Sequence, residues 1–253
     1  MANLMGVRMV VAVLLLWAGT AGADERVVRT LIDQGHDQRF LIEETGALHL
    51  SGVADIIRSR GSQVASTKKA LTDEVLKDIS ALVISGPFEA LKPEEVEAVA
   101  RFVERGGRLA VMLHIGSPLT GLLTRLDLDH SNAVLYERRN VIDNNNNFRV
   151  TALSASPLFN GLTQFSVYGC WALDPGKTGT PVAQTSPDAW IDLDGNKVLS
   201  KGDMIGAFTV AVSGTLGSGS FIVFGDDALF QNRYLDENNR KLAVNLAGWL
   251  AGQ

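Results

Sequence analysis

The chain has 253 residues, of which 46% are hydrophobic and 20% charged, and its formal net charge is −5. These proportions are ordinary for a packed globular protein. Because the balance is acidic and no basic stripe is present, nucleic-acid binding through bulk charge is excluded.

The first residues have the pattern of a secretory signal peptide. Arg8 gives a positive start, residues 9–18 are apolar and uncharged, and Ala21-Gly22-Ala23 supplies the small residues of an A-x-A cleavage site. The apolar run is shorter than the roughly 20 residues of a membrane-spanning helix. We therefore expect a signal peptide over 1–23 and a mature chain over 24–253 in the periplasm or otherwise exported. A retained N-terminal anchor is the alternative.

The single cysteine, Cys170, allows no internal disulfide, so stability must come from the hydrophobic core. The neighbouring residues 167–171 are mostly apolar and offer no histidine or other base to activate a thiol. The pattern predicts that Cys170 is a buried small hydrophobic residue rather than a nucleophile.

Strands and helices alternate in the first half of the chain. We predict strands at 26–32, 63–66, 81–84 and 108–113, and helices at 50–60, at 72–77 and from Lys92 to Gly106-Gly107. The last of these helices has Pro93 near its first position, acidic residues in its first turn and an apolar face. Such short alternation predicts a parallel sheet with helices on both faces and right-handed crossovers.

The second half has a different pattern, typical of antiparallel strand pairs. We expect these pairs at 132–153 around the polar turn 143–147, at 181–198 with a turn at 194–196, and at 208–224 around a glycine-rich loop. An amphipathic helix at 238–250 ends the chain. The prediction is one α/β domain over 24–253, with a mainly parallel sheet flanked by helices, an antiparallel hairpin extension, and the last helix packed on the sheet.

One acidic segment is similar to a calcium-binding loop. Asp192, Asp194 and Asn196 alternate, and Asp203 stands at the twelfth position. However, Lys197 occupies the position that needs glycine, so we predict a hairpin turn and no metal site. The sequence contains no P-loop, no G-x-S-x-G, no H-E-x-x-H and no Cys-x-x-Cys motif. We expect no cofactor and no catalytic residue.

Polar residues follow four of the predicted strands. In open α/β sheets, ligands bind outside the carboxyl ends of the strands, so strands of one direction would bring these residues to one rim. Asp and Ser after strands also cap helices, and that alternative stays open. The candidates for a ligand-binding rim are Asp33, His36, Ser85, His114, Ser117 and Asp226.

The C-terminal part resembles a known group of proteins. Residues 219–250, GSFIVFGDDALFQNRYLDENNRKLAVNLAGWL, are similar to exported or membrane-linked proteins of the class I glutamine-amidotransferase-like fold. This group includes the gliding-motility-type ABC transporter auxiliary proteins and a related group of unknown function, which LIDQGH at 31–36 and SPLFNGL at 156–162 also resemble.

The resemblance implies a flavodoxin-like sheet and recurrent polar positions at Asp226, Asn232 and Asn239, which adds Asn232 to the rim candidates. It also implies a non-enzymatic role, since such members generally lack the amidotransferase nucleophile. Residues 114–118, at the expected elbow, contain no cysteine. Ser117 is followed by Pro118, a pattern typical of a helix N-cap.

The sequence therefore predicts a non-catalytic binding or interaction module of the periplasm or cell envelope, an accessory of a transport or envelope complex. The expected partner is another envelope protein or a small polar ligand. Membrane association would come only through a partner or an uncleaved signal peptide. One alternative is a hydrolase that acts on a carbohydrate or peptide with His36, His114 and Asp226, and a second is a metal-binding protein at the same rim.

Overall fold

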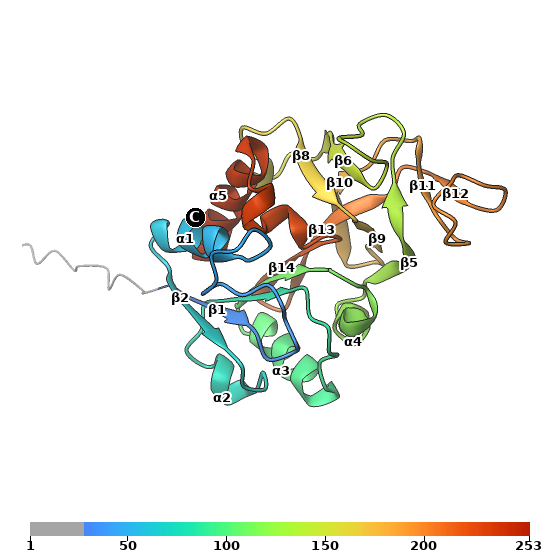
Figure 1. Cartoon of the computed structure of the whole chain (residues 1–253). Coiled ribbons are helices and arrows are strands. Elements are labelled where there is room, and N and C mark those ends of the chain that lie inside the picture. The colour runs from blue at the N-terminus through green and yellow to red at the C-terminus, as the bar shows by residue number, and fades with distance from the viewer. Residues whose placement is uncertain (1–27) are drawn as a thin grey trace, which may run out of the picture.

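The computed structural model describes residues 28–253, so the predicted signal peptide and the first mature residues lie outside the described part (Figure 1). A mixed 12-stranded sheet runs in the order β12-β11-β5-β9-β13-β14-β4-β3-β1-β2. β10 also pairs with β13, β7 pairs with β10, and β6 and β8 form a separate pair. Among these residues no helix combines the length and the apolar character needed to cross a bilayer.

The strands have the following bounds: β1 Arg29–Asp33, β2 Gln63–Thr67, β3 Ala81–Ser85, β4 Arg108–Met112, β5 Asp129–Tyr136, β6 Asn147–Val150, β7 Ala152–Leu153, β8 Phe165–Tyr168, β9 Trp171–Asp174, β10 Gly179–Gln184, β11 Ala189–Ile191, β12 Met204–Gly206, β13 Thr209–Leu216 and β14 Gly219–Phe224. The helices are α1 Ser51–Ser59, α2 Asp73–Leu76, α3 Pro93–Glu104, α4 Thr120–Arg125 and α5 Glu237–Ala251, with short 3₁₀ turns at Ser117–Leu119, Pro157–Phe159, Ala228–Phe230 and Asn232–Tyr234.

The central strands form a parallel core, as the alternating pattern predicts. β2, β1, β3, β4 and β14 are neighbours in this order, and each adjacent pair is parallel. β3 is buried along its whole length, which explains its continuous apolar sequence ALVI. Since the five strands share one direction, the loops after β1, β3, β4 and β14 leave from the same edge of the sheet.

The antiparallel half differs from the sequence prediction in its pairings. The hairpin of β13 and β14 is confirmed. Across the turn 143–147 the chain forms only an isolated antiparallel bridge between Val141 and Phe148. The longer strands pair elsewhere, β5 with β9 and β11, and β6 with β8. Likewise β10 pairs with β13, and β11 with β12. Residue patterns locate such strands, but their neighbours are chosen by long-range packing.

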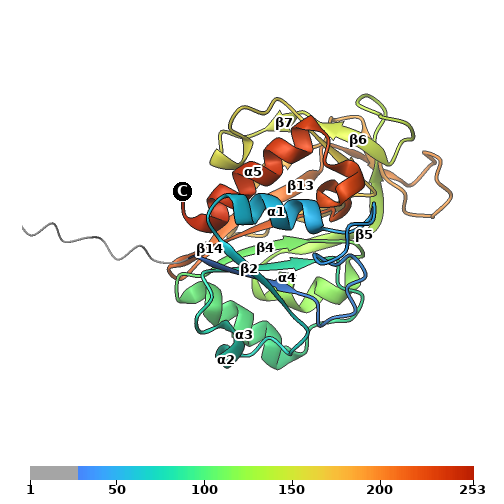
Figure 2. The same ribbon diagram turned by 60° about the vertical axis from the view of Figure 1, so that its left-hand side comes forward.

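Helices cover both faces of the sheet (Figures 1 and 2). One face carries α1 and α5 over a core that includes Phe148, Phe165 and Phe224, and the other carries α2, α3 and α4 over Leu82, Val99 and Leu109. Helix α5 begins at the cap residue Asp236, whose carboxylate accepts a hydrogen bond from the Asn239 backbone, and ends at Gly252 with φ +84°.

Cys170 lies in the first of these cores with no exposed surface. Burial raises the pKa of its thiol well above the ordinary value, so it stays protonated. The sequence prediction of a buried hydrophobic cysteine is confirmed.

The core on the α5 face leads to a stability prediction. Phe148→Ala removes a side chain that is 0% exposed, and we expect it to lower the free energy of unfolding by about 3–5 kcal/mol in urea titrations. Leu48→Ala is the control, because Leu48 is 45% exposed and its truncation should change stability by less than about 0.5 kcal/mol. Equal losses for the two variants would contradict the assigned core.

Candidate functional site

The polar residues that follow the parallel strands form two clusters at the carboxyl edge of the sheet. The first surrounds His36 in the loop after β1. Its Nδ1 lies 2.7 Å from Asp33 Oδ2, and its Nε2 lies 3.2 Å from Glu95 Oε1 on α3. His36 is 6% exposed, and its backbone carbonyl accepts hydrogen bonds from Phe88 and Glu89 in the loop after β3. The first cluster therefore ties three segments together.

The charges of the first cluster support one another. Burial alone lowers the pKa of His36, but hydrogen bonds and charges from Asp33 and Glu95 outweigh it and raise the pKa. Burial alone raises the pKa of Glu95. Hydrogen bonds from the backbone amides of Leu71 and Lys92, together with the charge of His36, outweigh it and lower that pKa. Both ring nitrogens of His36 are occupied, so this histidine holds the loops together and leaves no nitrogen for a ligand.

The second cluster centres on His114, just after β4. The Leu113 amide donates to the Phe224 carbonyl, which extends the pairing of β4 with β14 and brings His114 beside the residues after β14. His114 Nδ1 lies 3.0 Å from Asp227 Oδ1, and the His114 side chain is 35% exposed against 1% for Asp227. His114 Nε2 has no hydrogen-bond partner among residues 28–253.

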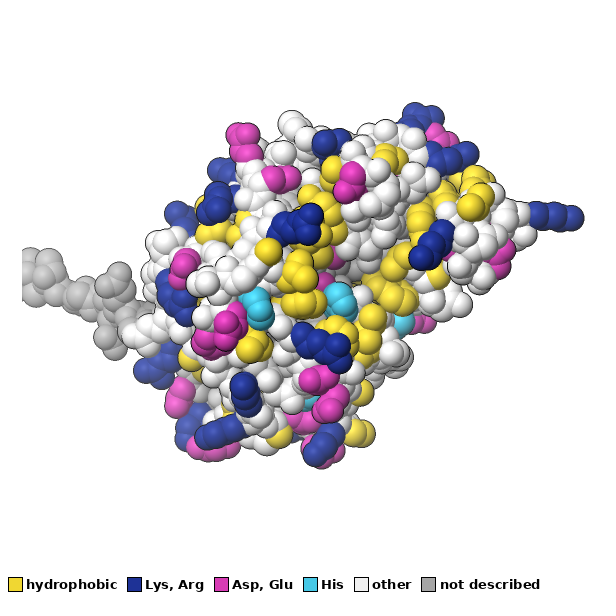
Figure 3. Space-filling model, in the orientation of Figure 1, with side chains coloured by type: hydrophobic (Ala, Val, Ile, Leu, Met, Phe, Trp, Pro, Cys, Tyr) yellow, Lys and Arg dark blue, Asp and Glu magenta, His cyan; other side chains and the backbone are white. Residues whose placement is uncertain are grey.

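Two aromatic side chains pack beside this histidine. The His114 ring lies 5.1 Å from the Phe40 ring and 5.0 Å from the Phe88 ring, measured between centroids. The Arg39 guanidinium stacks over Phe88 at 4.2 Å. Figure 3 shows histidine side chains exposed among hydrophobic ones near the middle of one face. The rim around His114 thus combines an oriented imidazole, apolar rings and a cation.

Two adjacent buried carboxyl groups, Asp226 and Asp227, lie near His114. Burial, together with the charge of Asp227, raises the pKa of Asp226 to about 8, and burial also raises the pKa of Asp227. The hydrogen bond to Asp227 raises the pKa of His114. Gly86 has φ +55°, and a Cβ there would collide with Asp227 Oδ2, so this position requires glycine.

The polar positions of the family resemblance hold segments in place. Asp226 accepts hydrogen bonds from the backbone of Tyr168 at 2.7 Å and of Ala228 at 2.9 Å. Asn232 bonds the Gly52 amide at the start of α1, and Asn239 bonds both the amide and the carbonyl of Ser166 in β8. Their side chains fasten β8 and α1 to the end of the parallel core.

The two serine candidates lie in different surroundings. Ser85 is buried and lines a small internal cavity with Ile32, Met112 and Phe230. Ser117 is exposed at the start of a 3₁₀ turn whose cap residue is Gly116. The sequence interpretation of Ser117 as the helix N-cap is wrong, because Gly116 occupies the cap position and Ser117 is the first residue of the turn.

Sequence reasoning missed several contributors to the two clusters. Glu95 is recognisable in the sequence only as an acidic residue in the first turn of its helix, whereas in the structure its carboxylate also contacts His36. Asp227 stands beside Asp226, and sequence alone cannot tell which of two neighbouring carboxylates faces His114. Arg39, Phe40 and Phe88 lie in loops without a periodic pattern, so no sequence signal marked them.

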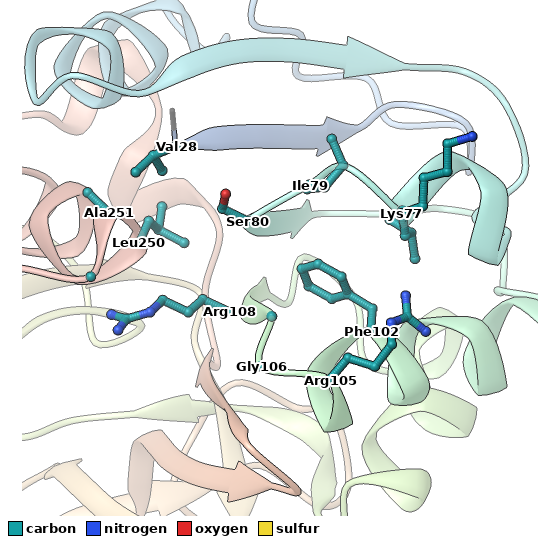
Figure 4. Close-up of a pocket in the computed structure, with 13 residues that line it drawn as sticks. Val28, Lys77, Ile79, Ser80, Phe102, Arg105, Gly106, Arg108, Leu250 and Ala251 are labelled. Carbon is teal, nitrogen blue, oxygen red and sulfur yellow. The ribbon is translucent and has the colours of Figure 1, made fainter. Parts of the chain in front are cut away.

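A further cavity of about 380 Å³ lies at the opposite, amino edge of the sheet (Figure 4). Its charged side chains already have partners within the protein. Lys77 pairs with Glu74 at 2.5 Å, Arg105 pairs with Asp73 at 3.1 Å, and Arg108 donates to the Trp249 carbonyl. It contains none of the predicted site residues.

The acidic hairpin between β11 and β12 brings Asp192, Asp194 and Asp203 together, with one oxygen of each within 4.8 Å of the others. Asp192 accepts from the backbone of Asn196 and Lys197, and Asp203 accepts from that of Leu193 and Ser200. The carboxylates thus shape the predicted hairpin.

Fold and rim together define an α/β protein with a mixed sheet and a histidine–carboxylate edge. The chain belongs to the family described as Domain of unknown function (DUF4350), whose pattern matches residues 45–247. A comparison with curated proteins finds no match.

Solved structures share this fold. The mmIFT52 N-terminal domain is similar at 18% identity with a TM-score of 0.70, covering 87% of this chain and 96% of that domain. ThuA-like proteins of Bacteroides uniformis and Parabacteroides merdae are each 12% identical, with TM-scores of 0.53 and 0.54. They cover 91% and 89% of this chain, and 94% and 90% of their own. The predicted fold class is confirmed, and similarity at these identities is evidence for the fold alone.

The His114–Asp227 pair leads to a titration prediction. Asp227→Asn removes the main cause of the raised pKa of His114, so we expect that pKa to fall in NMR titrations of the ring. Asp73→Asn, at a half-exposed surface carboxylate bonded to Arg101 and Arg105, is the control and should leave the His114 titration unchanged. An unchanged pKa in Asp227→Asn would exclude the hydrogen bond.

The Asp226 carboxyl group leads to a prediction on stability and pH. Its pKa is raised from 3.8 to about 8, so the native state binds this proton more tightly than the unfolded state does. Its contribution is fully present below pH 3.8 and is lost as the pH rises through about 8. We expect the melting temperature to fall between about pH 4 and 8, the window bounded by the unfolded and native pKa values, and to fall less in Asp226→Asn. Equal slopes in both proteins would contradict the raised pKa.

Proposed function

We propose that the chain is a non-catalytic binding module of the periplasm or cell envelope that presents the rim around His114 to a small polar ligand or a partner protein. The observation that carries this proposal is the geometry of His114. A buried carboxylate fixes one ring nitrogen, and the other is free at a partly exposed position beside the Phe40 and Phe88 rings, which also contact each other.

The rim offers the groups that small-molecule sites generally combine. Phe40 and Phe88 supply apolar surface, while His114 Nε2 and the Arg39 guanidinium supply donors. Because the pKa of His114 is raised, its protonated form donates from Nε2 over a wider pH range. A ligand with an acceptor oxygen, such as a carboxylate or a sugar hydroxyl, fits these groups.

Binding is favoured over catalysis by the surroundings of the histidine. Within residues 28–253 no hydroxyl or thiol hydrogen-bonds to the His114 ring, and the Cys170 thiol is enclosed in the core. A nucleophile must lie within hydrogen-bond reach of its base, and this arrangement does not provide one.

We assign the chain to the exported proteins related to the gliding-motility-type transporter auxiliaries, as an accessory of a transport or envelope complex. The sequence at 219–250 supports this assignment. Its recurrent polar positions, Asp226, Asn232 and Asn239, each accept a hydrogen bond from a backbone amide of another segment. Export rests on the signal-peptide pattern over 1–23.

One observation favours a second candidate, a hydrolase acting on a carbohydrate or peptide. An imidazole oriented by a buried carboxylate can take a proton from water, as His114 with Asp227 would. His36 and Asp226, the other two residues predicted for a hydrolase, are engaged elsewhere. Both ring nitrogens of His36 have carboxylate partners, and Asp226 accepts hydrogen bonds from backbone amides. Turnover on glycosidase, esterase and amidase substrates that is lost in a folded His114→Gln variant would establish the hydrolase.

A thermal-shift screen of residues 24–253 tests the binding proposal, with sugars, amino acids, nucleotides and divalent metals as probes. A ligand at about 100 times its dissociation constant stabilises the native state by about 2.7 kcal/mol, so we expect a clear rise in melting temperature. The rise should be lost in His114→Gln and kept in His49→Gln. If no probe acts and crosslinking of the full chain in bacterial envelopes captures no specific partner, the proposal is wrong.

A further inference from the structure

A second polar cavity, of about 360 Å³, lies away from the residues of the rim. It is lined by Tyr136 at the end of β5, by three asparagines of the turn before β6, Asn144 to Asn146, and by Lys197 of the β11–β12 hairpin. This hairpin projects from the body in both ribbon views (Figures 1 and 2). The hollow is open to solvent, because Asn144, Asn145 and Lys197 are exposed, and its volume lies near the lower end of the roughly 300–1,000 Å³ of small-molecule sites.

Asp143 and Asn147, at the two ends of the asparagine-rich turn, form hydrogen bonds through their side chains within the turn. Asp143 Oδ1 accepts hydrogen bonds from the Asn144 amide and from Asn147 Nδ2, each at 2.8 Å. This is the local bonding that makes Asp and Asn frequent in turns. Asp143 and Asn147 therefore account for the shape of the turn.

The three central asparagines use only their backbones. The carbonyl of Asn144 accepts from the Asn147 amide at 2.9 Å, that of Asn145 from Glu137 at 2.7 Å, and that of Asn146 from Gly169 at 2.9 Å. Their side-chain amides make no hydrogen bond within the described chain. Each thus keeps two N–H donors and a carbonyl acceptor free on a backbone that is fixed.

The walls of the cavity are also held in place. Glu137 is 0% exposed, and its carboxylate accepts from the backbone of Arg138 and of Ser186. Tyr136 stacks on Trp190 with ring centroids 4.4 Å apart. The asparagine side chains therefore project from a preorganised base, which reduces the entropic cost of binding.

We propose that Asn144, Asn145, Asn146, Tyr136 and Lys197 form a carbohydrate-binding site for one or two sugar units, with a preference for acidic sugars. Neighbouring sugar hydroxyls both donate and accept, and primary amides offer the matching pairs. The Lys197 ammonium has no carboxylate partner within residues 28–253, and it would meet a carboxylate on the sugar.

The experiment is an NMR titration of uniformly ¹⁵N-labelled protein, read at the side-chain amides. The probes are glucose, galactose, cellobiose, glucuronate and galacturonate, each up to about 20 mM, a range that detects millimolar affinity. We expect saturable shifts of the Asn144, Asn145 and Asn146 side-chain signals, larger with the acidic sugars at equal concentration. The signals around His114 should stay unchanged, which separates this site from the proposed function.

Matched variants locate the site. Asn145→Ala should weaken binding roughly fivefold, as expected for one lost hydrogen bond, and it should fold normally because that side chain bonds nothing. Lys197→Gln should equalise the affinities for glucuronate and glucose. Asn132→Ala, at an exposed asparagine of β5 outside the cavity, is the control and should bind like the parent protein.

Two results would overturn the inference. One is the absence of saturable shifts at the three asparagine side chains with all five sugars. The other is an unchanged affinity in a folded Asn145→Ala variant. Shifts confined to the His114 loops would likewise refute this site, while supporting a ligand at the rim.

Discussion

The structure depends on the pairing of β14 on both of its edges. β14 is parallel to β4 on one side and antiparallel to β13 on the other, so it joins the parallel core to the antiparallel half. Phe221 to Phe224 are almost completely buried, so both edges pair away from water, where an unpaired backbone group is costly. The same strand ends at Phe224, and Asp226 and Asp227 follow it at the carboxyl edge of the sheet.

His36 and His114, the two histidines at this edge, differ in burial and therefore in the contacts that they make. His36 is enclosed and bonded at both nitrogens, so the charge it shares with Asp33 and Glu95 serves to fix loops. His114 is bonded at one nitrogen and partly exposed, so its second ring nitrogen remains unpaired within the described residues. Carboxylates orient both rings, and the two histidines differ in burial and in the number of their partners.

The antiparallel half is where the proposed carbohydrate site lies, and the reason is geometric. β5 and β11 pair with each other, which stacks Tyr136 on Trp190 and places the acidic hairpin beside the asparagine turn. Loops held by a rigid sheet commonly carry binding groups, because their side chains are not needed for the core. Residues far apart in the chain, such as Asn145 and Lys197, become neighbours only through this pairing.

The sequence by itself determined the strands β1 to β4, the helices α1, α2, α3 and α5, the buried Cys170 and the edge at which polar residues gather, but not helix α4 or the place of β14 in the parallel core. Those features follow from local periodicity, turn residues and the single direction of βα units. Only the tertiary structure decided which antiparallel strands pair, that Asp227 rather than Asp226 faces His114, and that Glu95 encloses His36. Each of these depends on contacts between distant segments, and hydrophobic patterns carry no information on which of two adjacent polar side chains a distant partner will meet.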